Sequence, residues 1–224
     1  HLAHKAEHAV DMDSGALLAV ALHPADQGDT KTIEATLKEA RENIEAVMEE
    51  PEAKRNLHDT PLAEGVADKG YHSDAVLASF EEHEMRAYIS EPDRGRRNWK
   101  GKAPEHQEAL YANRRRIRGE RGKGLLRQRG ELIERSFAHC YETGAMRRCH
   151  LRGRENILKL LLIHTAAFNL GLLIRKQAGA GTPRQLAEIP GKASEKARET
   201  LKAALRALLR VLYATVVPPR FEKL

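Results

Sequence analysis

Apolar and polar residues alternate in part along residues 2–10, and an almost entirely apolar run follows at residues 16–22. Alternation is typical of a strand, and a short continuous apolar run is typical of a buried strand. The residues between them, 11–15, are mostly acidic or small and predict a turn. The segments together predict an antiparallel hairpin, which the dipeptide His23-Pro24 ends.

In residues 32–90, segments with the apolar spacing of a helix alternate with short segments typical of strands. Residues 51–61 are polar and predict a linker. A helix is expected on each side of the short apolar run that ends at Asp68, with a strand after the second helix. The predicted ranges are a helix at 32–50, a strand at 64–68, a helix at 74–84 and a strand at 86–90.

The second half of the chain predicts helices only. We expect helices at 105–117, 125–141, 155–177 and 193–214, separated by glycines at 119–124, a basic connection at 144–153 and a linker at 179–183. The apolar run from Leu158 to Ile174 is short for a membrane span and contains polar residues, so it predicts a buried helix and no membrane contact.

Charge is unevenly distributed along this chain of 224 residues, whose formal net charge is +6. Residues 1–90 carry 8 Lys and Arg against 19 Asp and Glu, a net charge of −11. Residues 91–154 carry 18 against 8, a net charge of +10. Such a division is expected where carboxylates hold metal and a basic surface holds phosphates. Two cysteines form no disulfide framework, which fits a reducing cytoplasm.

Two acids are the candidates for chemistry. Asp68 follows an apolar strand and precedes Ser73, a good helix cap, so it lies where open sheets place their functional groups. Glu134 lies one residue from the apolar side of its helix. A pair of carboxylates from separate elements suits Mg²⁺ or Mn²⁺. The alternatives are a capping or loop acid for Asp68 and a solvated helix acid for Glu134.

Cations cluster in a basic stretch at residues 91–124, which predicts a nucleic-acid surface. The only tryptophan lies among these cations, where it could stack on a base. A solubilising surface is the alternative. The predicted DNA-binding residues are Arg94, Arg96, Arg97, Trp99, Lys100, Arg114, Arg115, Arg116 and, further on, Arg135.

As a set, several segments resemble the DDE transposases of bacterial insertion sequences, over about residues 1–178 and in the same order. The resemblance implies a ribonuclease-H-like catalytic domain, with Asp68 as the second catalytic acid and Glu134 as the catalytic glutamate, both metal ligands. The segments are His4–Asp11, Pro24–Asp29, Ala67–Ser73, Tyr111–Arg114, Arg129–His139 and Leu151–Asn156.

The first catalytic aspartate of that family has no match, because it belongs to a strand upstream of His4. Asp11 lies in a turn and is left unassigned. The chain also begins with His1 rather than Met. The expected fold is therefore α/β with a mixed sheet: a ribonuclease-H-like fold without its first strand, at residues 1–178. Residues 179–224 are expected to form a linker and an additional helix.

The expected function is DNA transposition by Mg²⁺- or Mn²⁺-dependent strand cleavage and strand transfer. This chain is expected to be a truncated, inactive part of the enzyme. The expected partners are DNA and, in the complete enzyme, a second subunit, in the cytoplasm and on the nucleoid. The alternative is a nucleic-acid-binding protein without enzymatic activity, which needs only the arginine-rich surfaces.

Overall fold

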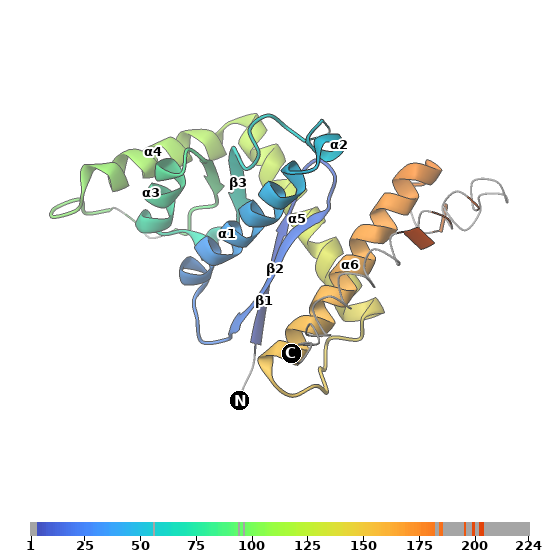
Figure 1. Ribbon diagram of the computed structural model, residues 1–224. Coiled ribbons are helices and arrows are strands. Elements are labelled where there is room, and N and C mark those ends of the chain that lie inside the picture. Colours follow the sequence, from blue (N-terminus) through green and yellow to red (C-terminus); the bar gives the residue numbers. More distant parts are fainter. Residues whose placement is uncertain are drawn as a thin grey trace, which may run out of the picture. The chain divides into compact units, whose positions relative to one another are not determined.

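The computed structural model describes residues 4–55, 57–93, 95, 97–181, 184, 185, 195, 199, 202 and 203. The chain divides into two compact units, residues 1–165 and residues 166–224, and each is described by itself. The strands of the described part belong to the first unit (Figure 1). The predicted domain boundary after residue 178 stays a prediction.

The predicted hairpin is confirmed. Strand β1 (His4–Val10) pairs antiparallel with β2 (Leu17–Pro24). Asp11 closes the turn by accepting hydrogen bonds from the backbone N–H and the hydroxyl of Ser14. The prediction that His23 and Pro24 end the strand is confirmed, because Pro24 is its last residue. Both residues still pair in the ladder, His23 with Lys5 and Pro24 with His4. Proline fits there because it is the terminal residue of its strand.

Helix α1 (Asp29–Met48) starts three residues before the predicted position. The predicted polar linker is partly helical, because α2 (Pro51–Lys54) forms one turn with proline at its first position. Strand β3 (Glu64–Ala67) is followed by α3 (Asp74–Glu82), and the Ser73 hydroxyl accepts from the Val76 N–H as the predicted cap.

The described strands form two separate two-stranded sheets, not the single mixed sheet that was expected. Strand β4 (Arg86–Ile89) pairs in parallel with β3, as a strand–helix–strand unit requires. A cavity of about 130 Å³ lies between β1 and β3 and is also lined by α1 and a later helix, α5 (Glu120–Ala138). The order of the elements was predicted, but the pairing between the hairpin and β3 was not observed.

Two helices follow the strands. Helix α4 (Pro104–Arg118) and α5 meet at Gly119, the only one of the three clustered glycines that interrupts a helix in this described stretch. Gly122 and Gly124 lie within α5, so their prediction as a break was wrong. Helix α5 continues into a π-helical turn, η2 (His139–Thr143), and contacts β1, β3 and β4 (Figure 1).

The main core lies between the β3–α3–β4 unit, α1 and α4. Asn113 of α4 is fully buried and its amide both donates to the Ile89 carbonyl, at 2.8 Å, and accepts from the Ile89 N–H, at 2.9 Å. It thereby occupies backbone groups at the edge of β4. The buried apolar members are Ile33, Ala67, Val76, Leu77, Phe80, Met85, Ala87, Ile89, Ala109 and Leu110.

Helix α6 (Arg154–Ala178) corrects another expectation, because it is not a buried helix. Its buried residues are Leu161 and Thr165, whereas Leu162 and Ile163 are exposed. It is long and apolar enough to cross a membrane, with 11% of its most apolar window buried, and length and composition alone are weak support for a span. Most of the helix predicted at 193–214 lies outside the described residues.

Candidate functional site

Asp68 lies where the sequence placed it, directly after β3. It caps a 3-10 turn, η1 (Lys69–Tyr71), by accepting from the Gly70 N–H at 2.8 Å. Its other carboxylate oxygen pairs with Arg129 of α5 at 3.3 Å, and 49% of the side chain is exposed. A partly exposed carboxylate at a strand end can exchange its cation partner, so the position is compatible with the predicted metal ligand.

Glu134 is exposed on the same helix, α5. Arg129, Leu132 and Ile133 lie on one face of α5 and line the cavity between the two sheets. Glu134 follows Ile133 directly and is not among the residues that line this cavity. The structure thus joins Asp68 to Arg129, and gives no contact between Asp68 and Glu134. Among the residues that the structure describes, no three His, Cys, Asp or Glu side chains are grouped to hold a metal.

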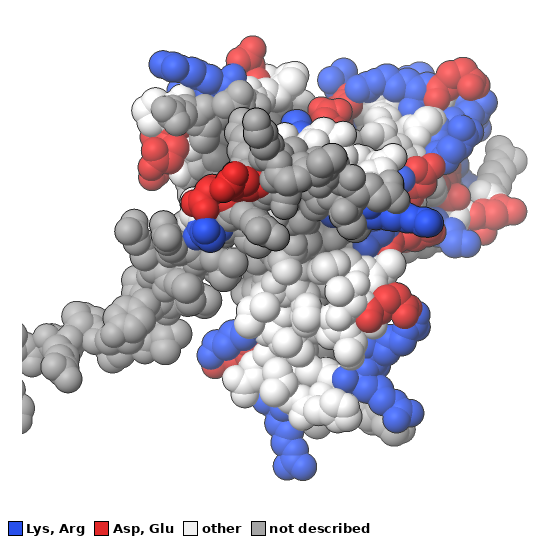
Figure 2. All heavy atoms as spheres, turned by 90° about the vertical axis from the view of Figure 1, so that its right-hand side faces the viewer, with Lys and Arg blue, Asp and Glu red and all other residues white. Residues whose placement is uncertain are grey.

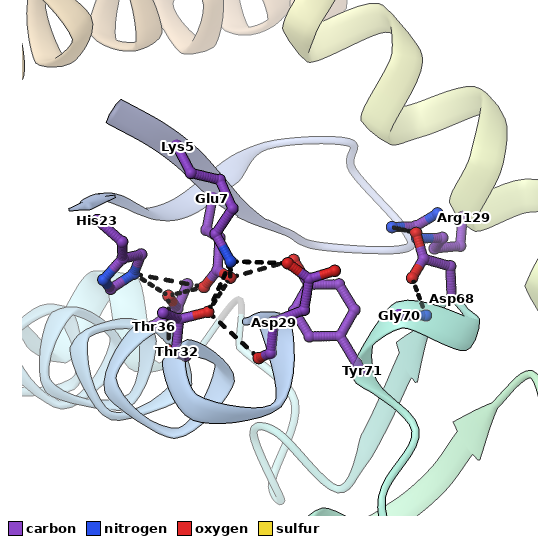
Figure 3. Close-up of polar contacts among 10 residues, drawn as sticks. All are labelled: Lys5, Glu7, His23, Asp29, Thr32, Thr36, Asp68, Gly70, Tyr71 and Arg129. Atoms are coloured by element: carbon purple, nitrogen blue, oxygen red, sulfur yellow. Dashed lines mark hydrogen bonds and ion pairs between the residues drawn. The ribbon is translucent and has the colours of Figure 1, made fainter. Parts of the chain in front are cut away.

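Glu7 of β1 lies at the centre of a buried polar network that the sequence did not predict (Figure 3). Its side chain is 3% exposed. The carboxylate accepts from the hydroxyls of Thr32 and Thr36, the latter at 2.6 Å, and from the Tyr71 hydroxyl at 3.3 Å. His23 Nε2 lies 3.4 Å from Oε2, the oxygen that also accepts from Thr36. These donors compensate for the cost of burying a carboxylate.

Lys5 extends this network to Asp29, the first residue of α1. Its ammonium lies 3.0 Å from Glu7 and donates to Asp29 Oδ1 at 2.7 Å (Figure 3). Burial works to lower the pKa of Lys5, but the contacts with Asp29 and Glu7 together raise it above its ordinary value. Asp29 in turn approaches Gly70, where an added β-carbon would overlap Asp29 Oδ2 and lie 3.1 Å from Asp68 Oδ1.

The pKa of the Tyr71 phenol is raised by its burial and by the carboxylates around it. Burial raises its pKa most, and the charges of Glu7, Asp29 and Asp68 raise it further. The three carboxylates therefore act on one phenol. They come from β1, from the start of α1 and from the end of β3, which are far apart in the sequence.

Several of the predicted DNA-binding cations are engaged with carboxylates. Arg97 pairs with Asp74 and, at 3.3 Å, with Glu91. Arg114 also pairs with Glu91, at 2.6 Å, and this pair lowers the pKa of Glu91. Burial works to raise the pKa of Asp74, but the neighbouring Lys102 and Arg97 together lower it. These pairs fix the segment after β4 to α3 and α4.

Two further predicted cations pair with carboxylates, and two others are exposed. Arg116 pairs with Glu81 at 2.8 Å and Arg135 with Glu131 at 3.5 Å, while Lys100 and Arg115 are exposed. On the face shown in Figure 2, Lys and Arg side chains (blue) are intermixed with Asp and Glu side chains (red). The side chains of Arg94 and Arg96 lie outside the described residues.

Trp99 is half-buried and packs against the main core. The Lys102 ammonium lies 5.4 Å from its ring centroid, and the Tyr111 ring lies 6.2 Å away. Stacking of Trp99 on a base stays a prediction, as do the DNA contacts of the arginines.

Sequence reasoning missed Lys5, Glu7 and Asp29. One signal was present: Thr32 and Thr36 are four residues apart on the buried face of α1, where two hydroxyls require partners. Glu7 stands on the strand that faces them. The partnership itself could not be derived, because it depends on how β1 packs against α1.

A family model described as "Transposase DDE domain" matches residues 3–170, which is most of the chain. The match includes the segments that carry the resemblance described above, and confirms that resemblance. No curated protein and no solved structure matches the chain.

Proposed function

We propose, from the premise that this chain belongs to the DDE transposase family, that its site serves metal-dependent cleavage of DNA at element ends and transfer of the cut strands to a target. The family implies a ribonuclease-H-like fold, DNA binding and a divalent metal. The observation that supports the proposal is the position of Asp68, at a strand end and within reach of the helix that carries Glu134.

The donor set near Asp68 fits Mg²⁺ or Mn²⁺. Both ions prefer oxygen ligands, keep several waters and need few carboxylates. When bound, such an ion activates a nucleophilic oxygen and stabilises a leaving oxygen of a phosphodiester. In the proposal Asp68 and Glu134 hold the ion. Arg129, which pairs with Asp68 here, is then available to contact a phosphate.

The described residues supply no group of three metal-liganding side chains. Phosphodiester cleavage in this family uses three acids, so we propose that this chain alone is inactive in cleavage. The proposed compartment is the cytoplasm, with the nucleoid as the place of DNA binding, and the complete enzyme is proposed to act as a dimer.

DNA is proposed to lie along the basic residues of the segment after β4 and of α4. Lys100 and Arg115 are exposed and reach phosphates directly. Arg97, Arg114 and Arg116 must first exchange a carboxylate for a phosphate. The proposed DNA contacts are Arg94, Arg96, Arg97, Trp99, Lys100, Arg114, Arg115, Arg116 and Arg135.

The test is binding of labelled duplex DNA, measured by fluorescence anisotropy with Mg²⁺ or with EDTA. The expected result is tighter binding with Mg²⁺ for the unchanged chain, and loss of this difference in Asp68→Asn and Glu134→Gln. A metal-independent affinity that survives both substitutions would favour the non-enzymatic DNA-binding protein. Mg²⁺-dependent strand cleavage that disappears in Asp68→Ala would contradict the proposed inactivity.

A further inference from the structure

We propose that Asp29 is a second carboxylate ligand beside Asp68, so that the start of α1 and the end of β3 hold one divalent cation over Gly70. The inference rests on the proposed metal at Asp68 and adds a residue to which no role has been assigned. Asp29 begins α1, immediately after the loop that follows β2.

Gly70 creates the space that the two carboxylates share. A β-carbon at this position would overlap Asp29 Oδ2 and lie 3.1 Å from Asp68 Oδ1. Both oxygens therefore border the volume that a side chain of any other residue would fill. A cation cannot occupy that point itself, which lies one bond length from the Gly70 α-carbon. With oxygen ligands at roughly 2.0–2.6 Å, it can bridge the two oxygens from beyond that point after small side-chain adjustments.

The two carboxylate oxygens of Asp29 have different neighbours. Oδ1 accepts from the Lys5 ammonium at 2.7 Å, and Oδ2 is the atom that borders the space over Gly70. Lys5 is itself fixed by Glu7 and by the Thr32 hydroxyl, at 3.0 Å each (Figure 3). The carboxylate of Asp29 is thus oriented before any cation arrives, which reduces the entropic cost of binding.

The charges around Gly70 favour a cation. The carboxylates of Glu7, Asp29 and Asp68 face the ammonium of Lys5 and the guanidinium of Arg129. Three negative groups against two positive groups leave an excess of negative charge. A capping function at the start of α1 explains an acid at position 29, because acids favour helix N-termini. It does not explain why Oδ2 approaches Asp68 across a glycine.

The experiment measures Mn²⁺ binding to the full chain by the electron paramagnetic resonance signal of free Mn²⁺. Asp29→Asn and Asp68→Asn are each expected to weaken binding roughly tenfold or more, since even an outer-shell partner of a metal site costs that much. Asp26→Asn is the matched control, because Asp26 is an exposed acid of the loop that precedes α1.

A second measurement locates the ion. Fe²⁺ replaces Mn²⁺ and, with added hydrogen peroxide, cleaves the backbone near its site, and the fragments are identified by mass spectrometry. Cuts are expected near both Asp29 and Asp68. Gly70→Ala is expected to abolish these cuts without changing any charge. This variant keeps the inference testable if circular dichroism shows that Asp29→Asn is unfolded.

The outcomes separate this inference from the proposed function. If Asp68→Asn weakens Mn²⁺ binding while Asp29→Asn behaves like Asp26→Asn, the inference is overturned and the metal site at Asp68 stands. If the unchanged chain binds no Mn²⁺ saturably, or Asp68→Asn has no effect, the metal part of the proposed function fails and the inference fails with it.

Discussion

Glu7 illustrates how single residues build the site. A buried carboxylate is tolerated because hydroxyl and ammonium donors surround it, and here these donors come from β1, α1 and η1. The same contacts fix the Tyr71 hydroxyl and therefore the turn that Asp68 caps. Asp68 is thus oriented by a residue that does not touch it. The strand, the helix and the turn are joined at the end of β3 where the proposed metal binds.

His8 has an acid-sensitive environment at the junction of β1 and α5. Its ring stacks on Phe137, with centroids 4.0 Å apart, and Nδ1 is 2.9 Å from the Ser136 hydroxyl, while Nε2 is buried without a partner. Burial lowers the pKa of His8 from 6.5 to about 4. The unfolded chain therefore takes up a proton at a higher pH than the folded chain does.

We predict that this difference destabilises the fold as the pH falls from 6.5 towards 4. Each pH unit in this window costs about 1.4 kcal/mol, and the cost is constant below the window. His8→Gln removes the titration, so the stability of the unchanged chain relative to His8→Gln should fall across the window. Urea unfolding at several pH values measures this. A difference that does not change with pH would contradict the prediction.

The elements were predicted more accurately than their packing. Alternation at residues 4–10 and the cap at Ser73 depend on neighbouring residues, so β1, its turn and α3 could be derived from the sequence. Whether the hairpin pairs with β3 is a tertiary question that no local pattern decides. The same is true of α6, whose apolar composition suggested burial although only Leu161 and Thr165 are buried. The position of Asp68 at a strand end could be predicted because its signal is local, whereas the network of Lys5 and Glu7 depends on contacts between elements.

Two glycines near the corner between α4 and α5 have different surroundings, so only one of them is needed for packing. A β-carbon on Gly122 would overlap the Arg116 carbonyl at the end of α4, whereas one on Gly124 meets nothing within 4 Å. Both residues lie in α5. Gly122 is therefore needed for the close approach of two backbones, and Gly124 is not.

We predict opposite effects of the two alanine substitutions on stability. Gly124→Ala should stabilise the fold by up to about 1 kcal/mol, because alanine favours the helix. Gly122→Ala should destabilise it by roughly 1–3 kcal/mol, because the added methyl group overpacks the corner. Thermal unfolding of the two variants measures the difference, and equal melting temperatures would show that the corner is not tightly packed.

Over the whole molecule, basic residues of the positively charged segment 91–154 form ion pairs with acids of the negatively charged first half. Arg97 pairs with Asp74, Arg116 with Glu81 and Arg121 with Glu64, so basic residues of the middle segment neutralise acids of the first ninety. Part of the charge asymmetry therefore holds the first unit together. The sequence could not separate these structural cations from those free to bind DNA, because the partners are distant in the chain.

We predict that the exposed cations dominate the electrostatic part of DNA binding. Each phosphate contact that is lost should lower the slope of log affinity against log salt concentration by about 1. Arg115→Gln and Lys100→Gln should each reduce the slope by this amount and weaken binding to all duplex sequences alike. Lys38→Gln is the control, because Lys38 is an exposed cation of α1, in the acidic half. Anisotropy titrations at several salt concentrations measure the slopes. Equal slopes for the Arg115→Gln and Lys38→Gln variants would place the DNA on another surface, because an exposed cation outside the interface releases no counterions on binding.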